Sequence, residues 1–148
     1  MKKQAYTMIA MIVLVGSLAI SAKAQTNGRI ALIANIPFHF SIGNKSLPAG
    51  EYTVQSISDD SRNAVLRIQS RDGKTSAMLQ TSAIEGKALD RAKLVFHRYG
   101  NQYFFAQAWV DGDSRGLEAQ KSRAERAAER EIAAIKMATA SVVVTARR

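Results

Sequence analysis

The chain of 148 residues contains no cysteine, only two prolines and only two histidines. Without cysteine the fold has no disulfide, so its stability must come from its hydrophobic core. A thiolate nucleophile and a cysteine-ligated metal are excluded as well. The histidines, His39 and His97, are far apart in sequence, whereas a zinc site needs three or four protein ligands at close spacing. We therefore predict no metal site and no cofactor.

Motifs that would carry catalysis are also missing. The sequence has no Gly-x-Ser-x-Gly elbow, no Gly-x-Gly-x-x-Gly fingerprint and no phosphate-binding loop. The segment from Asp111 to Gly116 begins like a calcium-binding loop. However, Arg115 stands where an oxygen ligand is needed, and Ser122 stands where the bidentate glutamate is needed. A polar turn is the better interpretation, and we predict no catalytic residue.

Residues 1–24 have the pattern of a cleaved signal peptide. Lys2 and Lys3 precede an apolar run from Met8 to Ile20, and Ala22-Lys23-Ala24 fits the small-x-small cleavage site. The run of about 13 residues is shorter than the roughly 20 that a membrane-spanning helix needs. We predict an exported protein, periplasmic or secreted, that begins at Gln25 and keeps no transmembrane segment after cleavage.

The positive charge does not indicate nucleic-acid binding. Cleavage would leave 124 residues and remove three lysines, so the net charge would fall from +9 to +6. The remaining basic residues are spread along the chain without a run of three, and acidic residues lie between them. A phosphate-binding face would require clustering, so no nucleic-acid partner is predicted. Weak attraction to anionic envelope surfaces is the expected consequence of this charge.

Residues 25–148 are predicted to form a single all-β domain with one C-terminal helix. Apolar side chains alternate along Ile36, Phe38, Phe40 and Ile42, as in a half-buried strand. Turn residues and further alternating segments follow at short intervals. This spacing favours an antiparallel β-barrel or sandwich of about six to eight strands. Pro37 is expected to mark a bend, a bulge or an edge.

Two hairpins define the expected register. Residues 64–70 and 75–81 flank Asp72-Gly73, for which a two-residue type I′ turn is predicted, with Leu66 opposite Leu79. Residues 82–92 are predicted to be a loop. Residues 93–99 and 102–110 flank Gly100-Asn101. That turn places Phe96 opposite Phe105, Leu94 opposite Gln107, and Trp109 on the Phe96 face.

Both faces of the second hairpin are apolar, so a further element should cover it. A helix is predicted near residues 122–137, with Ser122 and Glu125 as a capping box. Its stripe of Ala124, Ala128, Ile132 and Ile135 is expected to pack on the face formed by Val95, Ala106 and Ala108. Residues 117–120 are expected to be extended, and residues 140–146 to form a last strand that could pair with an open edge.

The aromatic residues are the one cluster with functional promise. A binding site for a small apolar or sugar-like ligand could be formed by Tyr52, His97, Tyr99, Tyr103 and Trp109. Packing of these aromatic residues in a β core is the favoured interpretation, and the ligand site is the alternative. The leading hypothesis is a non-enzymatic envelope or secreted module that binds a partner or has a structural role. The alternatives are a small barrel enzyme that uses His97 with a nearby Tyr or Arg, and a subunit that pairs through a strand edge or the C-terminal helix.

Four segments together resemble a family of small exported bacterial proteins. They are Ile36-Pro37-Phe38-x-Phe40, the stretch from Gly43 to Tyr52 with Leu47-Pro48-Ala49-Gly50, the stretch from Lys93 to Gly100, and the stretch from Lys121 to Arg126. The resemblance spans roughly residues 33–130. It implies an envelope or secreted location, and it carries no catalytic residue, cofactor or ligand.

Overall fold

The computed structural model describes residues 31–58, 62–135 and 139–148. The predicted signal peptide, residues 1–24, lies outside them. The described chain forms ten strands and one helix: β1 (Ala31–Ile36), β2 (Phe40–Ile42), β3 (Lys45–Leu47), β4 (Gly50–Ser56), β5 (Asn63–Ser70), β6 (Ser76–Glu85), β7 (Lys93–Tyr99), β8 (Gln102–Trp109), β9 (Arg115–Ala119), α2 (Arg123–Ile135) and β10 (Thr139–Arg147).

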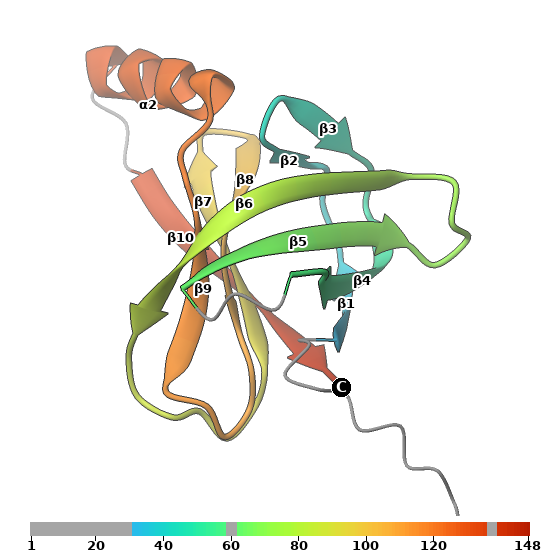
Figure 1. Ribbon diagram of the computed structural model, residues 1–148. Coiled ribbons are helices and arrows are strands. Elements are labelled where there is room, and N and C mark those ends of the chain that lie inside the picture. The colour runs from blue at the N-terminus through green and yellow to red at the C-terminus, as the bar shows by residue number, and fades with distance from the viewer. Residues whose placement is uncertain (1–30, 59–61, 136–138) are drawn as a thin grey trace, which may run out of the picture.

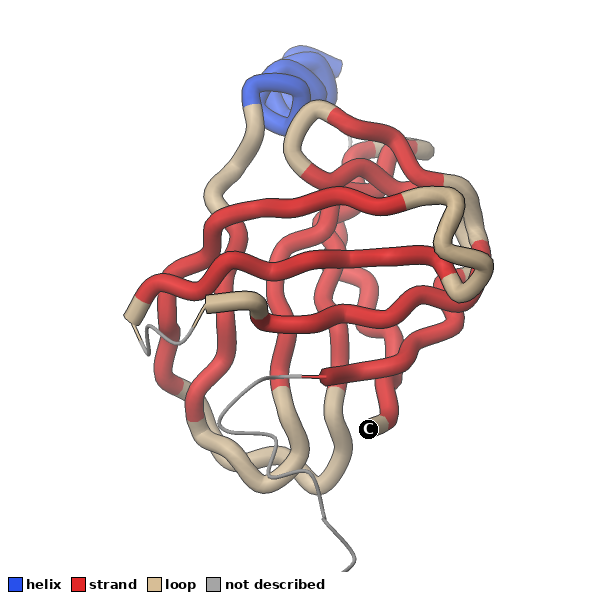
Figure 2. Tube along the Cα trace, turned by 45° about the vertical axis from the view of Figure 1, so that its right-hand side comes forward, coloured by secondary structure: helices blue, strands red, loops and turns tan. Residues whose placement is uncertain are grey.

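Eight of these strands close into an antiparallel barrel (Figures 1 and 2). Around the ring the order is β1, β4, β5, β6, β9, β8, β7 and β10. Closure depends on two late strands. The short β9 pairs with both β6 and β8, and β10 pairs with both β7 and β1. The prediction of an all-β fold with one C-terminal helix is confirmed, and the architecture is a barrel.

The hairpin β2–β3 lies beside this ring and is attached to it at β8. β1 ends at Ile36, directly before Pro37, whose ring nitrogen cannot donate to a ladder, so the predicted bend is confirmed. β2 joins the sheet through a parallel pairing of Ser41 with Phe104. The Lys45 ammonium also donates to the backbone carbonyl of Ser76 at 2.6 Å, which ties the hairpin to β6.

The interior of the barrel is packed with aromatic and aliphatic side chains. The ring of Phe96 is met edge-on by Phe38, Phe40 and Phe105, with ring centroids 5.2, 5.4 and 5.8 Å away. Such edge-to-face contacts add to the free energy gained by burying apolar surface. The alternation predicts nine core residues, and seven of them are buried in this cluster: Ile36, Phe40, Leu66, Ile68, Leu94, Phe96 and Phe105. The other two, Phe38 and Leu79, are partly buried and pack against it.

The first hairpin has the predicted register but a different turn. Leu66 faces Leu79 as expected. The predicted two-residue type I′ turn is wrong, because the hairpin closes where the Ser70 N–H donates to the Thr75 carbonyl, leaving a four-residue loop. The Asp72 carboxylate accepts from the Ser70 hydroxyl and the Lys74 N–H, and these bonds lower its pKa and fix the wider loop. The predicted two-residue loop and the observed four-residue loop have the same midpoint, between Asp72 and Gly73. Both therefore give the same pairing of residues across the two strands.

The predicted loop at residues 82–92 is wrong in its first part. β6 continues to Glu85, and its second half pairs with β9 from Thr81↔Ala119 to Glu85↔Arg115. Ser82, Ala83 and Ile84 do not alternate in polarity, so the sequence gives no strand signal there. The partner strand supplies the ladder instead. That partner is β9, which contains residues 117–119 of the segment that was predicted to be extended at 117–120.

A β-bulge in the second hairpin shifts the pairing register of β7 and β8 for the residues that follow Phe105. Phe96 faces Phe105 as predicted, but the register shifts between Val95 and Phe96, and Leu94 faces Ala108. The predicted pairing of Leu94 with Gln107 is therefore wrong. So is the predicted face of Trp109, because the extra residue turns its ring to the outer side, against Gly86 and Gly116. A Cβ at Gly116 would lie 2.6 Å from this ring, so only glycine leaves room for it.

Helix α2 covers one end of the second hairpin from outside (Figure 1). Its Ala128 and Ile132 pack on Tyr99 and Phe104. A helix that covers this face of the hairpin was predicted, with contacts to Val95, Ala106 and Ala108. The contact with Ala108 is wrong, because the bulge turns Ala108 into the barrel, and the helix packs on Tyr99 and Phe104 instead. Of the predicted stripe, Ala124 is exposed and Ile135 is 59% exposed. The last strand, predicted at residues 140–146, is β10.

We expect Phe96→Ala to lower the free energy of unfolding by about 3–5 kcal/mol, because it removes a fully buried ring and leaves a cavity. Urea unfolding measures the change. Met78→Ala is the matched control, since Met78 is 62% exposed and its loss should cost less than about 0.5 kcal/mol. A loss below about 1 kcal/mol for Phe96→Ala would contradict its central place in the core.

Candidate functional site

The five residues predicted to bind a ligand lie on opposite sides of the barrel wall. Tyr52 points into the barrel, is 1% exposed, and donates its hydroxyl to the Pro48 carbonyl at 2.7 Å. Tyr103 lies on the same interior side and stacks on Phe38 with centroids 4.1 Å apart. The guanidinium of Arg98 lies 5.6 Å from the Tyr103 ring. These contacts make Tyr52 and Tyr103 parts of the core packing.

Trp109 lies on the outer face with a different set of neighbours. Its indole N–H donates to Gln107 Oε1 at 2.9 Å, and the Gln107 amide donates to Glu118 at 2.9 Å. The ammonium of Lys93 lies 5.7 Å from the Trp109 ring. The ring is 8% exposed, because the two glycines and this lysine surround it. Trp109 therefore shares no pocket with Tyr52, from which the barrel wall separates it.

The structure does bring His97 and Tyr99 together, under the first turn of helix α2. Glu125 Oε1 lies 2.7 Å from His97 Nδ1 and accepts the Tyr99 hydroxyl at 3.3 Å. The Glu125 side chain is 5% exposed. The Glu125 N–H donates to Ser122 Oγ at 3.1 Å, which confirms Ser122 as the helix N-cap. The Glu125 carboxylate bonds to His97 and Tyr99 of the barrel, and the capping-box interpretation did not predict this role.

A second pair of charges adjoins this junction. Lys121 Nζ and Glu129 Oε1 are 2.6 Å apart, and this bond raises the pKa of the lysine. Burial raises the pKa of the Tyr99 hydroxyl, and the nearby Glu125 carboxylate raises it further. The junction thus favours a neutral Tyr99 hydroxyl, which donates to Glu125 Oε1. The bonds of Glu125 join helix α2 to β7 of the barrel. The bond between Lys121 and Glu129 joins the segment before the helix to the helix.

A carboxylate that holds an imidazole in place is also a component of general-base catalysis. The His97–Glu125 pair is thus the geometry that the enzyme alternative would require. Here the same carboxylate also accepts the Tyr99 hydroxyl, and Tyr99 and Glu125 are buried under the helix, whereas the His97 side chain is 27% exposed. A buried carboxylate needs such donors, since an unpaired one is costly. This cluster anchors the helix, because Glu125 on the first turn bonds to His97 Nδ1 and to the Tyr99 hydroxyl on β7.

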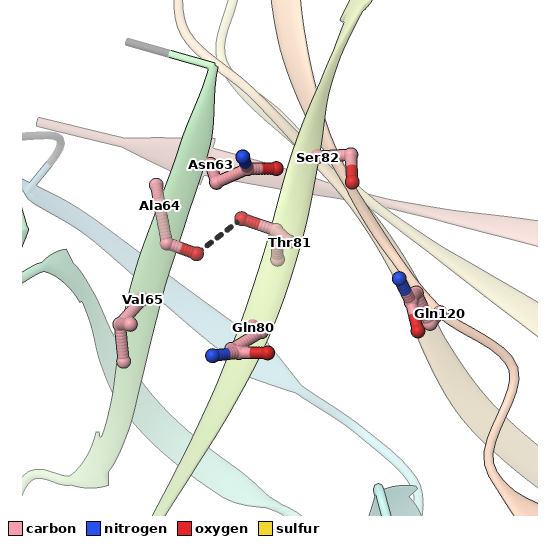
Figure 3. Close-up of a pocket in the computed structure, with 7 residues that line it drawn as sticks. All are labelled: Asn63, Ala64, Val65, Gln80, Thr81, Ser82 and Gln120. Carbon is pink, nitrogen blue, oxygen red and sulfur yellow. Dashed lines mark hydrogen bonds between the residues drawn. The ribbon is translucent and has the colours of Figure 1, made fainter. Parts of the chain in front are cut away.

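A hollow of about 300 Å³ lies on the outer face of the barrel, where β5, β6 and the residue after β9 meet (Figure 3). We call it the amide hollow and define it by its polar side chains: Asn63, Gln80, Ser82 and Gln120. Ala64, Val65 and Thr81 complete its lining. Within the described part of the chain, the four polar side chains have no hydrogen-bond partner, so their donors and acceptors face solvent.

The strands fix the position of these side chains. Asn63 pairs with Ser82 across β5 and β6, and both point outward, since the alternate residues Ala64 and Thr81 are buried. The Thr81 hydroxyl donates to the Ala64 carbonyl at 2.8 Å, which joins the two strands behind the hollow (Figure 3). This site was not predicted from the sequence. Its only signal is the polar alternation of Gln80 and Ser82, which any solvent-facing strand shares.

A second hollow, of about 320 Å³, lies on the outer face of β1, β4 and β10. Its charged groups already pair with one another or with neighbours. Glu51 lies 3.0 Å from Arg71 and 3.7 Å from Arg147. Because its charged groups pair in this way, this hollow offers a ligand only the polar side chains of Asn35 and Thr145, fewer than the amide hollow offers.

Within residues 31–58, 62–135 and 139–148, no three His, Asp or Glu side chains are placed to hold a metal ion together. In the same residues, no helix has the length and apolar character to span a membrane. Comparisons with protein-family models, curated proteins and solved structures find no match for this chain. The candidate site therefore rests on geometry alone.

We expect the stability of the junction to decline in alkali. Because the pKa of Tyr99 is raised in the folded state, its stabilising contribution is complete below about pH 10 and is lost as the pH rises through the folded-state value. Tyr99→Phe removes a donor to a buried carboxylate and should cost about 1–3 kcal/mol at pH 8. It should also reduce the further loss of stability that the unmodified chain shows as the pH rises above about 10.

Urea unfolding at several pH values measures both effects. Tyr103→Phe is the matched control, because it removes the same hydroxyl from a ring outside the junction. Its stability should decline in alkali as steeply as that of the unmodified chain. Equal alkaline slopes for Tyr99→Phe and the unmodified chain would contradict the assigned role of Tyr99.

Proposed function

We propose that this protein is an exported, non-enzymatic β-barrel module that binds its partner on the outer surface of the barrel. The observation that supports an outer site is the packed interior. Eight-stranded barrels either fill their interior with side chains or hold one small ligand there. Here Phe96, Phe40 and Tyr52 are at most 1% exposed and lie edge to face, occupying the space that a ligand would need.

Export is supported by residues 1–24, which have the charged, apolar and small-residue regions of a signal peptide. The resemblance to small exported bacterial proteins points the same way. The basic mature chain is suited to envelope surfaces, which carry anionic groups. We therefore propose the cell envelope as the place where the partner is found.

The proposal that the module is not an enzyme is supported by two sets of polar side chains, the His97–Glu125 pair and the amide hollow. The His97–Glu125 pair is engaged with Tyr99 beneath helix α2, and these contacts explain it as a helix anchor. The free polar groups of the amide hollow are neutral amides and a hydroxyl, which can donate and accept hydrogen bonds but are weak acids and bases. Such groups are suited to binding.

Fractionation of cells that produce the full chain tests both parts of this proposal. Mass spectrometry should find a 124-residue form beginning at Gln25 in the periplasm, the envelope or the medium. This purified form should sediment with isolated envelopes, and the binding should persist in about 1 M salt, where the Debye length is about 3 Å.

Measuring envelope binding at low and at high salt distinguishes binding to a specific partner from nonspecific attraction between the basic chain and anionic surfaces. A form that keeps Met1 in the cytoplasm would refute export. Binding that disappears in high salt, or no binding to envelopes at all, would refute the outer-surface module. Phe96→Ala is a control for aggregation. This destabilised variant should sediment whether or not envelopes are present, whereas the unmodified chain should sediment only with them.

A further inference from the structure

We propose that the amide hollow binds a neutral, hydroxyl-rich ligand, a segment of an oligosaccharide. This inference deepens the proposed function and rests on it, since it identifies the chemistry of a partner at the outer surface. It starts from four outward polar side chains, Asn63, Gln80, Ser82 and Gln120, that surround one hollow and lack partners in the described part of the chain.

The hydrogen-bonding capacity of the hollow matches that of a sugar. Each carboxamide offers two N–H donors and an acceptor oxygen, and the Ser82 hydroxyl both donates and accepts. Sugar hydroxyls also do both, so each can pair with either end of an amide. The lining residues carry no formal charge. A phosphate, carboxylate or ammonium ligand would therefore lose its hydration without gaining an opposite charge.

The closed barrel disfavours an extended peptide at this place. Peptides often bind to a sheet by adding a strand to a free edge. Here β5 pairs with β6 along the hollow, and β9 pairs with β6 from Thr81 onward, so most backbone groups along the hollow are used within the ladders. A ligand must consequently be recognised by the projecting side chains. This selects a molecule whose own polar groups project in several directions, as sugar hydroxyls do.

The arrangement of the side chains adds a geometric reason. Figure 3 shows Asn63, Ser82, Gln120 and Gln80 placed around Thr81, and they come from three different segments of the chain. Because three of them lie on paired strands, their backbone is already ordered before binding. Binding then costs mainly the side-chain freedom of the amides. The hollow is shallow and holds few contacts, so a single sugar segment should bind with a Kd of roughly millimolar.

Nuclear magnetic resonance titration of the 15N-labelled mature chain tests this inference. The probes are cellotriose, maltotriose and triacetylchitotriose, which are neutral and differ in linkage and substituents. At least one should produce saturable shifts of the side-chain amide signals of Asn63, Gln80 and Gln120. The amide signal of Gln102, an exposed glutamine on β8 outside the hollow, should not move.

Variants tie the shifts to the site. Asn63→Ala and Gln80→Ala should each weaken binding about fivefold, the change that one lost hydrogen bond produces. Gln102→Ala is the matched control and should leave the Kd unchanged. All these side chains are at the surface, so the variants should remain folded, and their backbone spectra verify this.

Three results would overturn the assignment. The first is an absence of shifts with all three trisaccharides up to roughly 50 mM, well above the expected Kd. The second is equal or larger shifts with trialanine or trigalacturonate, which would indicate a peptide or acidic ligand. The third is a Kd that Asn63→Ala and Gln80→Ala leave unchanged. If envelope binding persists in any of these cases, only the ligand assignment falls. If envelope binding is also absent, the proposed function falls with it.

Discussion

The edge-to-face packing of Phe96 against Phe38, Phe40 and Phe105 is the contact on which the rest of the structure depends. The four rings join three parts of the chain: the turn after β1, the hairpin β2–β3, and the central hairpin β7–β8. With no cysteine to cross-link the chain, this packing and the aliphatic side chains around it must supply the free energy of folding. They also occupy the interior, which is why we place recognition outside.

Closure of the barrel makes the C-terminal part of the chain indispensable. The chain leaves the ring after β9, forms helix α2 and returns as β10 between β7 and β1. Glu125 fixes this excursion through its bonds to His97 and Tyr99. A truncation after Gln120 would remove the closing strand together with the helix. It would leave the edges of β1 and β7 unpaired, which is a known cause of aggregation.

The sequence predicted the parts of this fold that depend on alternation. The residues of the core, the pairing of Leu66 with Leu79 and the N-cap at Ser122 all follow from local patterns. The bulge beyond Phe105 could not be predicted, because Phe104, Phe105 and Ala106 are all apolar and fit either register. This one inserted residue moved Trp109 outward and displaced the expected helix contact.

The candidate site depends on information that no local pattern contains. Gln120 follows β9, and only the pairing of β9 with β6 brings it beside Gln80 and Ser82. Glu125 fits a capping motif perfectly well in sequence, and its bond to His97 appears only when the helix is placed on the barrel. Tyr52 and Trp109 were grouped by composition, but the barrel wall separates them. Surface sites on barrels thus depend on which strands become neighbours.

The claim that the interior is filled can be tested with xenon, which enters apolar cavities in proteins. Methyl spectra of the folded chain under xenon pressure would monitor Leu32, Val54, Leu66 and Leu94, which are all fully buried. The account predicts that these signals show no saturable shift, because packed side chains leave no space for the gas. Saturable shifts of these interior methyl groups would reveal a cavity and would contradict the assignment of recognition to the outer surface.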